Sequence, residues 1–321
     1  MRLVGSQALI LLLLFGAAPI RHAADGTQNR PDQHPDGTVR VAMKNVMYHF
    51  SDTVSAHIVR LQGTLTPTRP GELVVFDDKN SFLLHLTSAE IAVSCNSMAE
   101  VMNQDVFQAP DAPIKKVEVS AKGNLLVIKG ALRQHSGLPF EVEGELTAEP
   151  DGRIRFHARH VKAAHVPMKG LLDLLGLDIA KLINTRKVEG LSADKDDLIL
   201  NPEQIFPAPH IRGQVTRVRL QGNDIIQEYG GVPGASFAAR ETGNYMAYRD
   251  NNIRFGKLTM HDADLTLLDM DPQDPFDFFL DHYKDQLVAG YTKTTPEFGL
   301  RVYTRDYNKL HNRSTASRRS R

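Results

Sequence analysis

The segment from Phe140 to Ala158 constrains the fold most, because it contains two runs of alternating apolar and polar residues on either side of a turn. Apolar or small residues occupy every second position from Phe140 to Ala148 and again from Ile154 to Ala158. A period of two residues is typical of a β-strand with one buried face. Pro-Asp-Gly at 150–152 is typical of a three-residue hairpin turn, in which Gly takes the left-handed conformation. The segment therefore predicts an antiparallel hairpin.

This turn also sets which residues of the two strands face each other. Acidic residues then lie opposite basic ones on the exposed face, and two apolar side chains meet on the buried face. The expected pairs are Glu149 with Arg153, Glu145 with His157, Glu143 with Arg159, and Leu146 with Phe156. Each exposed pair adds about 0.2–1 kcal/mol. A slip of one residue would turn the charged row toward the core, so charge and hydrophobicity predict the same register.

A leucine-rich segment at 168–183 follows the hairpin, and its apolar residues recur at helical spacing. One face of the expected helix is formed by Leu171, Leu172, Leu175, Ile179, Leu182 and Ile183. Leu174 and Leu177 fall on the opposite side, where a helix with one buried face is polar. Gly176 is a point at which the run could divide into two short helices. Two interpretations stay open: a core helix covered on both sides, or a helix whose extra leucines line a groove for an acyl chain or touch a membrane.

Most of the remaining chain also alternates with the period of a strand. Turn sequences such as Gly123-Asn124 and Gly222-Asn223 separate the runs, which indicates a meander of hairpins. At least a dozen strands and two or three short helices are expected, which excludes an alternating strand–helix nucleotide-binding fold. A sheet of this length must curl or close. The predicted fold class is α+β, with a long curved antiparallel sheet wrapped around the short helices.

Two further short helices are expected. Ser97 and Glu100 have the spacing of a capping box, which predicts a helix from Met98 to about Phe107. This helix could act as a lid over one end of the sheet, or its methionines could form a rim that adapts to a ligand. Asp274-Pro275 has the form of a helix start. The expected buried face of that second helix is Phe276, Phe279, Leu280, Tyr283 and Leu287.

A connector with three prolines spans 201–209. Proline removes a backbone donor and fixes φ, so the sequence argues against a central strand or a helix in this run. Ile205 and Phe206 are the apolar residues of the connector that could tuck into the sheet.

The ends of the chain predict an exported protein. A short apolar run after Met1-Arg2 is typical of a signal peptide at 1–24, with cleavage expected after Ala18, Ala23 or Ala24. A disordered linker at 25–37, one β-rich domain at 38–310 and a basic disordered tail at 311–321 complete the expected organisation, with a candidate sub-boundary at 230–243. Cys95 lies far from the signal segment, so no lipidated N-terminal cysteine is expected, and no second long apolar segment follows. The expected location is the periplasm or the exterior of the cell.

The charges of the chain balance, with 38 basic and 38 acidic residues. A basic patch is the usual footprint of nucleic-acid binding, so nucleic acid is not an expected partner. The tail carries four arginines and no acid. It could touch an anionic membrane surface at about 1 kcal/mol per charge, or it could be simply solvated.

A search for catalytic chemistry yields no catalytic residue, metal ligand or cofactor. The chain contains no Gly-x-Ser-x-Gly, His-Glu-x-x-His, Gly-x-Gly-x-x-Gly or Walker sequence. His157, His160 and His165 cluster in sequence, but on a strand His160 points away from the other two. Asp269-Met-Asp271 begins like a calcium loop, and Pro272 interrupts that pattern. No residue near Cys95 indicates an activated thiol.

The middle third of the chain resembles the LmeA-like exported phospholipid-binding proteins. The resemblance covers Val166–Ile183 with its preceding hairpin, and LILNPEQIFPAPHIRGQVTRVRLQGNDI from Leu198 to Ile225. In that family a short helix, the pattern Leu-x-Leu-Asp-Pro-x-x-Leu and a strand follow one another. The matching residues here are Leu198, Leu200, Asn201, Pro202 and Ile205, with Asn201 in place of the usual Asp. The resemblance implies a curved sheet packed on helices around a groove accessible to lipid, and lipid binding and shuttling in the envelope.

The segments Asn244–Met260 and Asp274–Tyr303 resemble a group of uncharacterised exported bacterial proteins. Neither resemblance transfers a catalytic residue, so the protein is not expected to be an enzyme.

The favoured functional hypothesis is a binding protein for a phospholipid or similar amphiphile, without a cofactor. The acyl chain would lie in a groove beside the 168–183 helix, in contact with Met168, Leu171, Leu174, Leu175, Leu177 and Ile179. Lys169 and Lys181 are the candidates that would meet the head group. One alternative is a non-catalytic structural protein of the envelope with a filled core. Another is a hydrolase that uses paired carboxylates among Asp262 to Asp271.

Overall fold

The computed structural model describes residues 37–110, 112, 114–133, 137–163, 166–167, 189–206, 208–231, 237 and 241–310, with the backbone alone at 163, 166 and 167. The chain divides into two compact units, Met1–Asp32 and Gln33–Arg321, and every described residue belongs to the second. The expected signal peptide at 1–24, nearly all of the linker at 25–37, the leucine-rich helix at 168–183 and the tail at 311–321 lie outside the described residues.

Strands account for most of the described chain, and the helices between them are short. This confirms a β-rich α+β fold with large, mainly antiparallel sheets. The expectation of a simple meander was too narrow, because parallel pairs also occur. They join β1 (Val39–His49) to β19 (Phe276–Phe279), β4 (Phe82–Ser94) to β12 (Ile211–Arg212), β3 (Val74–Val75) to β16 (Ile253–Phe255), and β18 (Asp264–Asp269) to β21 (Leu300–Thr304).

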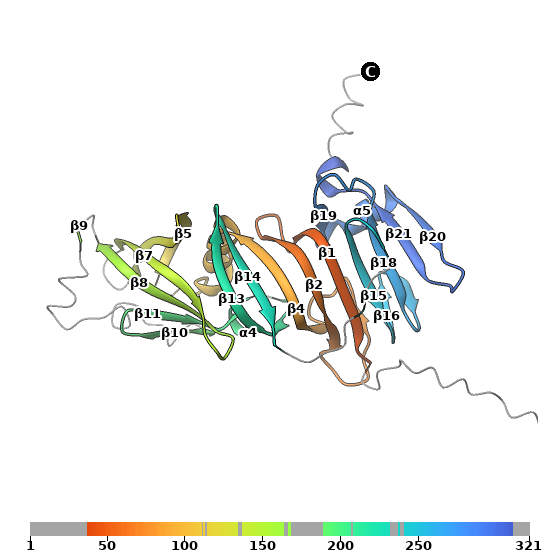
Figure 1. The fold of residues 1–321 in the computed structure, drawn as a ribbon, viewed down its shortest axis with the longest axis horizontal. Helices are drawn as coiled ribbons and strands as arrows, with labels where there is room; N and C mark the ends of the chain where they lie inside the picture. Colours follow the sequence, from red (N-terminus) through yellow and green to blue (C-terminus); the bar gives the residue numbers. More distant parts are fainter. Residues whose placement is uncertain are drawn as a thin grey trace, which may run out of the picture. The chain divides into compact units, whose positions relative to one another are not determined.

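The largest sheet among the described residues has 11 strands. Figure 1 shows its main path, and two short strands, β12 and β19, join it at β4 and β1. The path runs in the order β13 (Gln214–Gln221), β14 (Asp224–Gly230), β4, β2 (Ser55–Pro67), β1, β15 (Tyr245–Arg249), β18, β21 and β20 (Tyr291–Thr294).

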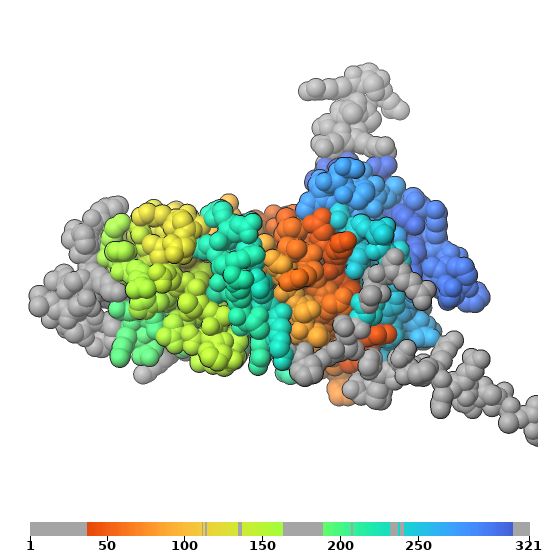
Figure 2. All heavy atoms as spheres, in the orientation of Figure 1, coloured from red at the N-terminus to blue at the C-terminus, as the bar shows by residue number. Residues whose placement is uncertain are grey.

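A second sheet of seven strands lies next to β13, and β7 contacts β13 directly. On the face drawn in Figure 2, atoms of the two sheets touch along this line. Its order is β10 (Leu191–Asp194), β11 (Asp197–Leu200), β8 (Ile154–Ala163), β7 (Leu138–Ala148), β6 (Leu125–Leu132) and β5 (Ile114–Lys122), with β9 (Val166–Pro167) beside β8. A small third sheet joins β3, β16 and β17 (Leu258–Met260).

The expected hairpin is formed by β7 and β8, and most of its register is confirmed. Glu145 faces His157, Leu146 faces Phe156, and the amide of Glu149 donates to the carbonyl of Arg153 over 2.8 Å. The expected pairing of Glu143 with Arg159 was wrong, because the register shifts between Glu143 and Gly144 and Glu143 faces His160.

The shift occurs where two strands come unusually close. A Cβ atom on Gly144 would lie 2.4 Å from the carbonyl oxygen of His157 and 2.7 Å from the ring of Phe156. Only glycine fits where the strands approach this closely. The shift in register is a β-bulge, in which one strand has an extra residue.

The first expected helix forms, but it begins earlier than its capping pattern predicts. It consists of α1 (Cys95–Val101), which continues as the π-helical turn η1 (Met102–Val106). The N-cap is Ser94, whose hydroxyl accepts from the amide of Ser97 over 3.0 Å, so Ser97 is not the cap. In the described part of the chain, no helix is long and apolar enough to span a membrane.

The helix expected directly after Asp274-Pro275 was wrong in its first turn. Residues Phe276–Phe279 form β19, which pairs with β1 instead. Aromatic residues fit a pleated sheet well, and pairing with a neighbouring strand outweighs a local cap signal. Helical structure starts only with the 3-10 turn η4 (Leu280–His282) and α5 (Tyr283–Val288).

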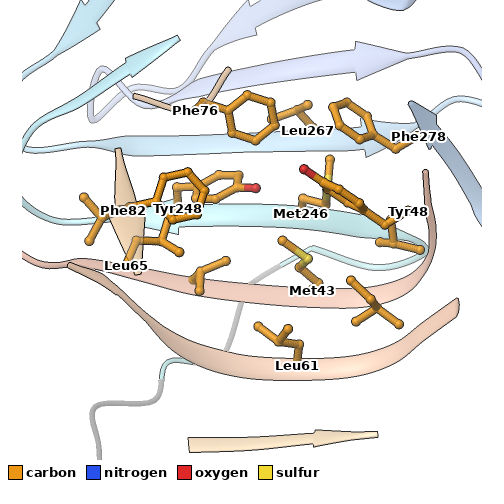
Figure 3. Close-up of a cluster of buried hydrophobic side chains, with 14 of the residues drawn as sticks. Met43, Tyr48, Leu61, Leu65, Phe76, Phe82, Met246, Tyr248, Leu267 and Phe278 are labelled. Atoms are coloured by element: carbon orange, nitrogen blue, oxygen red, sulfur yellow. The ribbon is translucent and has the colours of Figure 1, made fainter. Parts of the chain in front are cut away.

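Buried apolar side chains form two large clusters, one beneath each of the two larger sheets. Figure 3 shows part of the first, where β1, β2, β15, β18 and β19 contribute residues such as Met43, Leu61 and Phe278. The second cluster joins α1 and η1 to β5–β8. Five half-buried residues pack against both clusters, which makes the core continuous: Phe50, Ile91, Leu146, Leu200 and Val218.

Candidate functional site

An apolar cavity of about 130 Å³ lies within this core. Strands β1, β2 and β4 supply much of its wall, and Phe206, Pro209 and Ile211 also line it. The wall includes Met43, Ala56, Ile58, Leu61, Leu65 and Ile91. The alternation of β2 places Ala56 and Ile58 on the buried face, and the register shift against β4 after Ile58 keeps Leu61 on that face. Local patterning therefore explains why this wall is apolar.

A second cavity of about 70 Å³ adjoins the first. It is lined by Met98 and Met102 of α1 and η1, by apolar residues of β5–β8, and by Leu198 and Leu200 of β11. Phe206 and Gln227 line both cavities. These two side chains therefore stand at the boundary between the two spaces.

The connector at 201–209 positions Phe206. Asn201 caps the short helix α4 (Pro202–Ile205), with its side-chain oxygen accepting from the amide of Glu203 over 3.1 Å. The expectation that prolines exclude a helix here was wrong, because Pro202 occupies the first turn, where its missing donor is not needed. The expectation that Ile205 and Phe206 tuck inward is confirmed, since Ile205 is buried and Phe206 reaches both cavities.

Among the described residues that line the two cavities, none has a charged side chain. The polar residues among the described residues that line the first cavity are Ser55, Gln227, Tyr48, Tyr229 and Tyr248. Burial raises the pKa of all three tyrosines, so each stays a neutral phenol at physiological pH. The described lining residues are therefore mostly apolar with a few uncharged polar ones, which is the composition of a ligand pocket.

The groove residues expected from the sequence lie outside the described residues. They are Met168, Leu171, Leu174, Leu175, Leu177 and Ile179, together with the head-group candidates Lys169 and Lys181. The cavity residues Tyr48, Gln227 and Tyr248 were not expected as site residues. The sequence marks Tyr48 and Tyr248 only as members of strands, and nothing in it distinguishes them from other core residues.

The remaining sequence candidates do not assemble a catalytic centre in the described part of the chain. His157 lies 2.6 Å from Asp197, while His160 faces Glu143 at 3.9 Å, and His165 is not described. Cys95 is buried, and burial raises the pKa of its thiol, which disfavours the nucleophilic thiolate.

Three acids do converge near the end of the described chain. Oxygen atoms of Asp269, Asp271 and Asp306 lie within 4.8 Å of one another. Asp306 is fully buried, accepts from the amide of Asp277 over 2.9 Å, and accepts from the ammonium of Lys309 over 2.7 Å. Because the amide of Asp277 in β19 and the ammonium of Lys309 satisfy Asp306, these contacts fasten the segment of Asp306 to β19.

Burial raises the pKa of Asp306 from 3.8 to about 6, although Lys309 acts against this shift. The folded state therefore binds this proton more tightly than the unfolded state does. The stability that protonation of Asp306 contributes is fully present below pH 3.8 and is lost as the pH rises to about 6. Neither cavity is lined by any of the three acids.

Comparison of the chain with models of protein families, with curated proteins and with solved structures finds no match.

Proposed function

We propose that the protein is an exported binding protein for a lipid or similar amphiphile, whose acyl chain enters the apolar cavities between β1, β2, β4 and the 206–211 segment. The observation that carries this proposal is a cavity of about 130 Å³ lined mainly by apolar side chains, with no charged residue among the described residues of its wall. A close-packed core leaves few voids larger than a water molecule, so a space of this size is unusual for a protein whose core is simply filled.

The size of the cavity limits how much ligand it holds. Apolar cavities of about 150 Å³ in other proteins stay dry and bind benzene. The first cavity thus matches a short stretch of hydrocarbon, and movement of Phe206 would connect it with the second cavity of about 70 Å³. Each methylene that leaves water for such a site contributes about 0.8 kcal/mol. The rest of an amphiphile would extend toward solvent.

The leucine-rich helix extends the proposal. We propose that the sheets curve around the expected 168–183 helix. The apolar lining of the cavities would then continue along the groove residues of this helix, which are Met168, Leu171, Leu174, Leu175, Leu177 and Ile179. Lys169 and Lys181 would then meet a head group at the mouth. The expected signal peptide at 1–24 and the resemblance to LmeA-like proteins support export and a role in lipid handling within the cell envelope.

A structural envelope protein with a filled core is the main alternative, and the two cavities favour the binding role over it. A carboxylate hydrolase is less favoured. Its candidates Asp269 and Asp271 converge with Asp306, but they line neither cavity. Asp271 partly neutralises Arg305, and Asp306 pairs with Lys309.

Native mass spectrometry of the protein, purified without detergent, tests the proposal. We expect discrete added masses that extract into organic solvent as lipid. Leu174→Asp combined with Leu177→Asp should remove these masses if the helix completes the groove, whereas exchange of the exposed Val288 for Asp should not. A clean apo mass that stays unchanged after incubation with phosphatidylcholine–phosphatidylglycerol vesicles would contradict lipid binding and leave the structural role.

A further inference from the structure

Two buried tyrosines line the first cavity. Tyr48 on β1 is 7 % exposed and Tyr248 on β15 is 2 % exposed, and both line the cavity. Figure 3 shows the two hydroxyl groups directed toward one another. The aromatic rings themselves are fixed by neighbours, since Tyr48 packs 5.5 Å from Phe278 and Tyr248 packs 5.6 Å from Phe76, measured between ring centroids.

Neither hydroxyl has a hydrogen-bond partner among the described residues. Tyrosine hydroxyls that are buried usually find one, because water is no longer there to replace it. Phenylalanine would fill the same volume at both positions without this cost. Two unpaired hydroxyls in one apolar cavity therefore indicate groups that a ligand satisfies.

A third donor lies at the boundary with the second cavity. Gln227 is 1 % exposed, and its Oε1 accepts from the hydroxyl of Tyr229 over 2.8 Å. Its Nε2 amide makes no hydrogen bond within the described part of the chain, so it remains available as a donor toward the cavities. Each of these unpaired groups can donate a hydrogen bond, and the two hydroxyls can also accept one. Among the described lining residues, none carries a positive charge that would hold an anion.

We infer that the buried part of the ligand carries an uncharged acceptor oxygen, an ester or ketone carbonyl, which accepts hydrogen bonds from Tyr48 and Tyr248. This inference rests on the proposed lipid-binding function and specifies its ligand: a neutral acyl ester enters, while a carboxylate or a phosphate head group stays outside. A carboxylate in this cavity would lose its hydration without meeting an opposite charge. Gln227 supplies the donor for a ligand that reaches the second cavity.

Competition with the fluorescent probe 1-aminoanthracene tests the inference on the full mature protein after lipid removal. The competitors share a chain of twelve carbons: dodecane, methyl laurate and, at pH 8, laurate. For the wild type we expect methyl laurate to bind about tenfold more tightly than dodecane, as one net hydrogen bond provides. Laurate should bind at least tenfold more weakly than its ester.

The double substitution Tyr48→Phe, Tyr248→Phe should abolish the preference for the ester and leave dodecane binding unchanged or tighter. Tyr245→Phe is the matched control, since Tyr245 lies on the same strand as Tyr248 but belongs to a separate apolar cluster on the other face of the sheet. Circular dichroism and thermal unfolding check that each variant is folded.

The outcomes separate the two claims. If dodecane and the ester both bind, and the double variant keeps the wild-type preference, the tyrosine assignment is wrong while the proposed function stands. The assignment is equally wrong if laurate binds more tightly than its ester. If the probe and all three ligands fail to bind the wild type, both the assignment and the proposed function are overturned.

Discussion

Replacement of Ala56 by leucine tests whether the first cavity is an empty space that a side chain can fill. Ala56 lines the cavity from β2, where it is the smallest apolar residue of the wall. The substitution adds three carbon atoms on the buried face of the strand. In a close-packed core they would collide with neighbours, whereas here they enter a space of about 130 Å³.

The expected magnitude follows from the carbons that become buried. At about 0.8 kcal/mol per buried methylene, three carbons give a ceiling of about 2.4 kcal/mol. Loss of side-chain freedom and imperfect fit reduce this gain, so we expect Ala56→Leu to raise the free energy of unfolding by about 1–2 kcal/mol. In a filled core the same change would lower it by about 1–3 kcal/mol.

Two measurements are made on lipid-free protein. Urea unfolding gives the free energy of unfolding, and a separate titration of the folded protein gives its affinity for 1-aminoanthracene. We expect the variant to be more stable and to bind the probe at least tenfold more weakly, because the inserted side chain takes the ligand's place. Ala289→Leu is the matched control at an exposed position and should change neither quantity appreciably. A folded Ala56→Leu variant that is destabilised by more than 1 kcal/mol, or that binds the probe as the wild type does, would refute the cavity.

Three further predictions concern other parts of the fold. Phe206→Ala should connect the two cavities. In this variant an ester whose chain is two methylenes longer should bind about tenfold more tightly than the shorter ester, measured by the same competition assay. In the wild type, the titration of Asp306 should lower the free energy of unfolding by at most about 3 kcal/mol between pH 3.8 and about 6. Asp306→Asn should remove this decline. If urea unfolding gives the same pH dependence for the wild type and the variant, the raised pKa of Asp306 is contradicted. Gly144→Ala should lower the free energy of unfolding by about 1–3 kcal/mol, because its Cβ would lie 2.4 Å from a carbonyl oxygen. Gly230→Ala, whose Cβ would meet only Thr216 at 3.8 Å, should be tolerated in the same urea assay.

The hairpin of β7 and β8 shows what alternation and turn chemistry can predict. Both are local properties, so strand positions, the turn and most pairs follow from the sequence, including Glu145 with His157. The bulge at Gly144 does not follow, because it arises from the approach of His157 and Phe156 across the strands. Nothing in the local pattern records that distance.

In the segment after Asp274-Pro275, strand pairing with a distant part of the chain outweighs a local helix-start pattern. Its cap-like start predicts a helix, yet Phe276–Phe279 pair with β1, about 230 residues earlier in the chain. Asp274 serves instead as a partner of Lys309, at 3.0 Å. A helix does follow, but only once the pairing with β1 has ended.

The cavity itself was beyond prediction from the sequence. Periodicity correctly places Tyr48 and Tyr248 in strands, but they come from β1 and β15, and the space between them is defined only when those strands meet. Phe206 belongs to a connector in which an inward position was expected, and its role between two cavities emerges from α4 and β14 together. A void has no residue pattern of its own.

The most direct measurement is a crystal structure of the mature protein with methyl 2-bromododecanoate, in which the bromine is bonded to the carbon next to the ester and anomalous scattering locates it. The account predicts a bromine peak inside one of the two cavities, with the ester carbonyl within hydrogen-bond distance of Tyr48 or Tyr248. Bromine found only on the surface, or a core in which side chains occupy the space beside Ile58 and Leu61, would contradict the claim that this fold encloses a lipid-binding cavity.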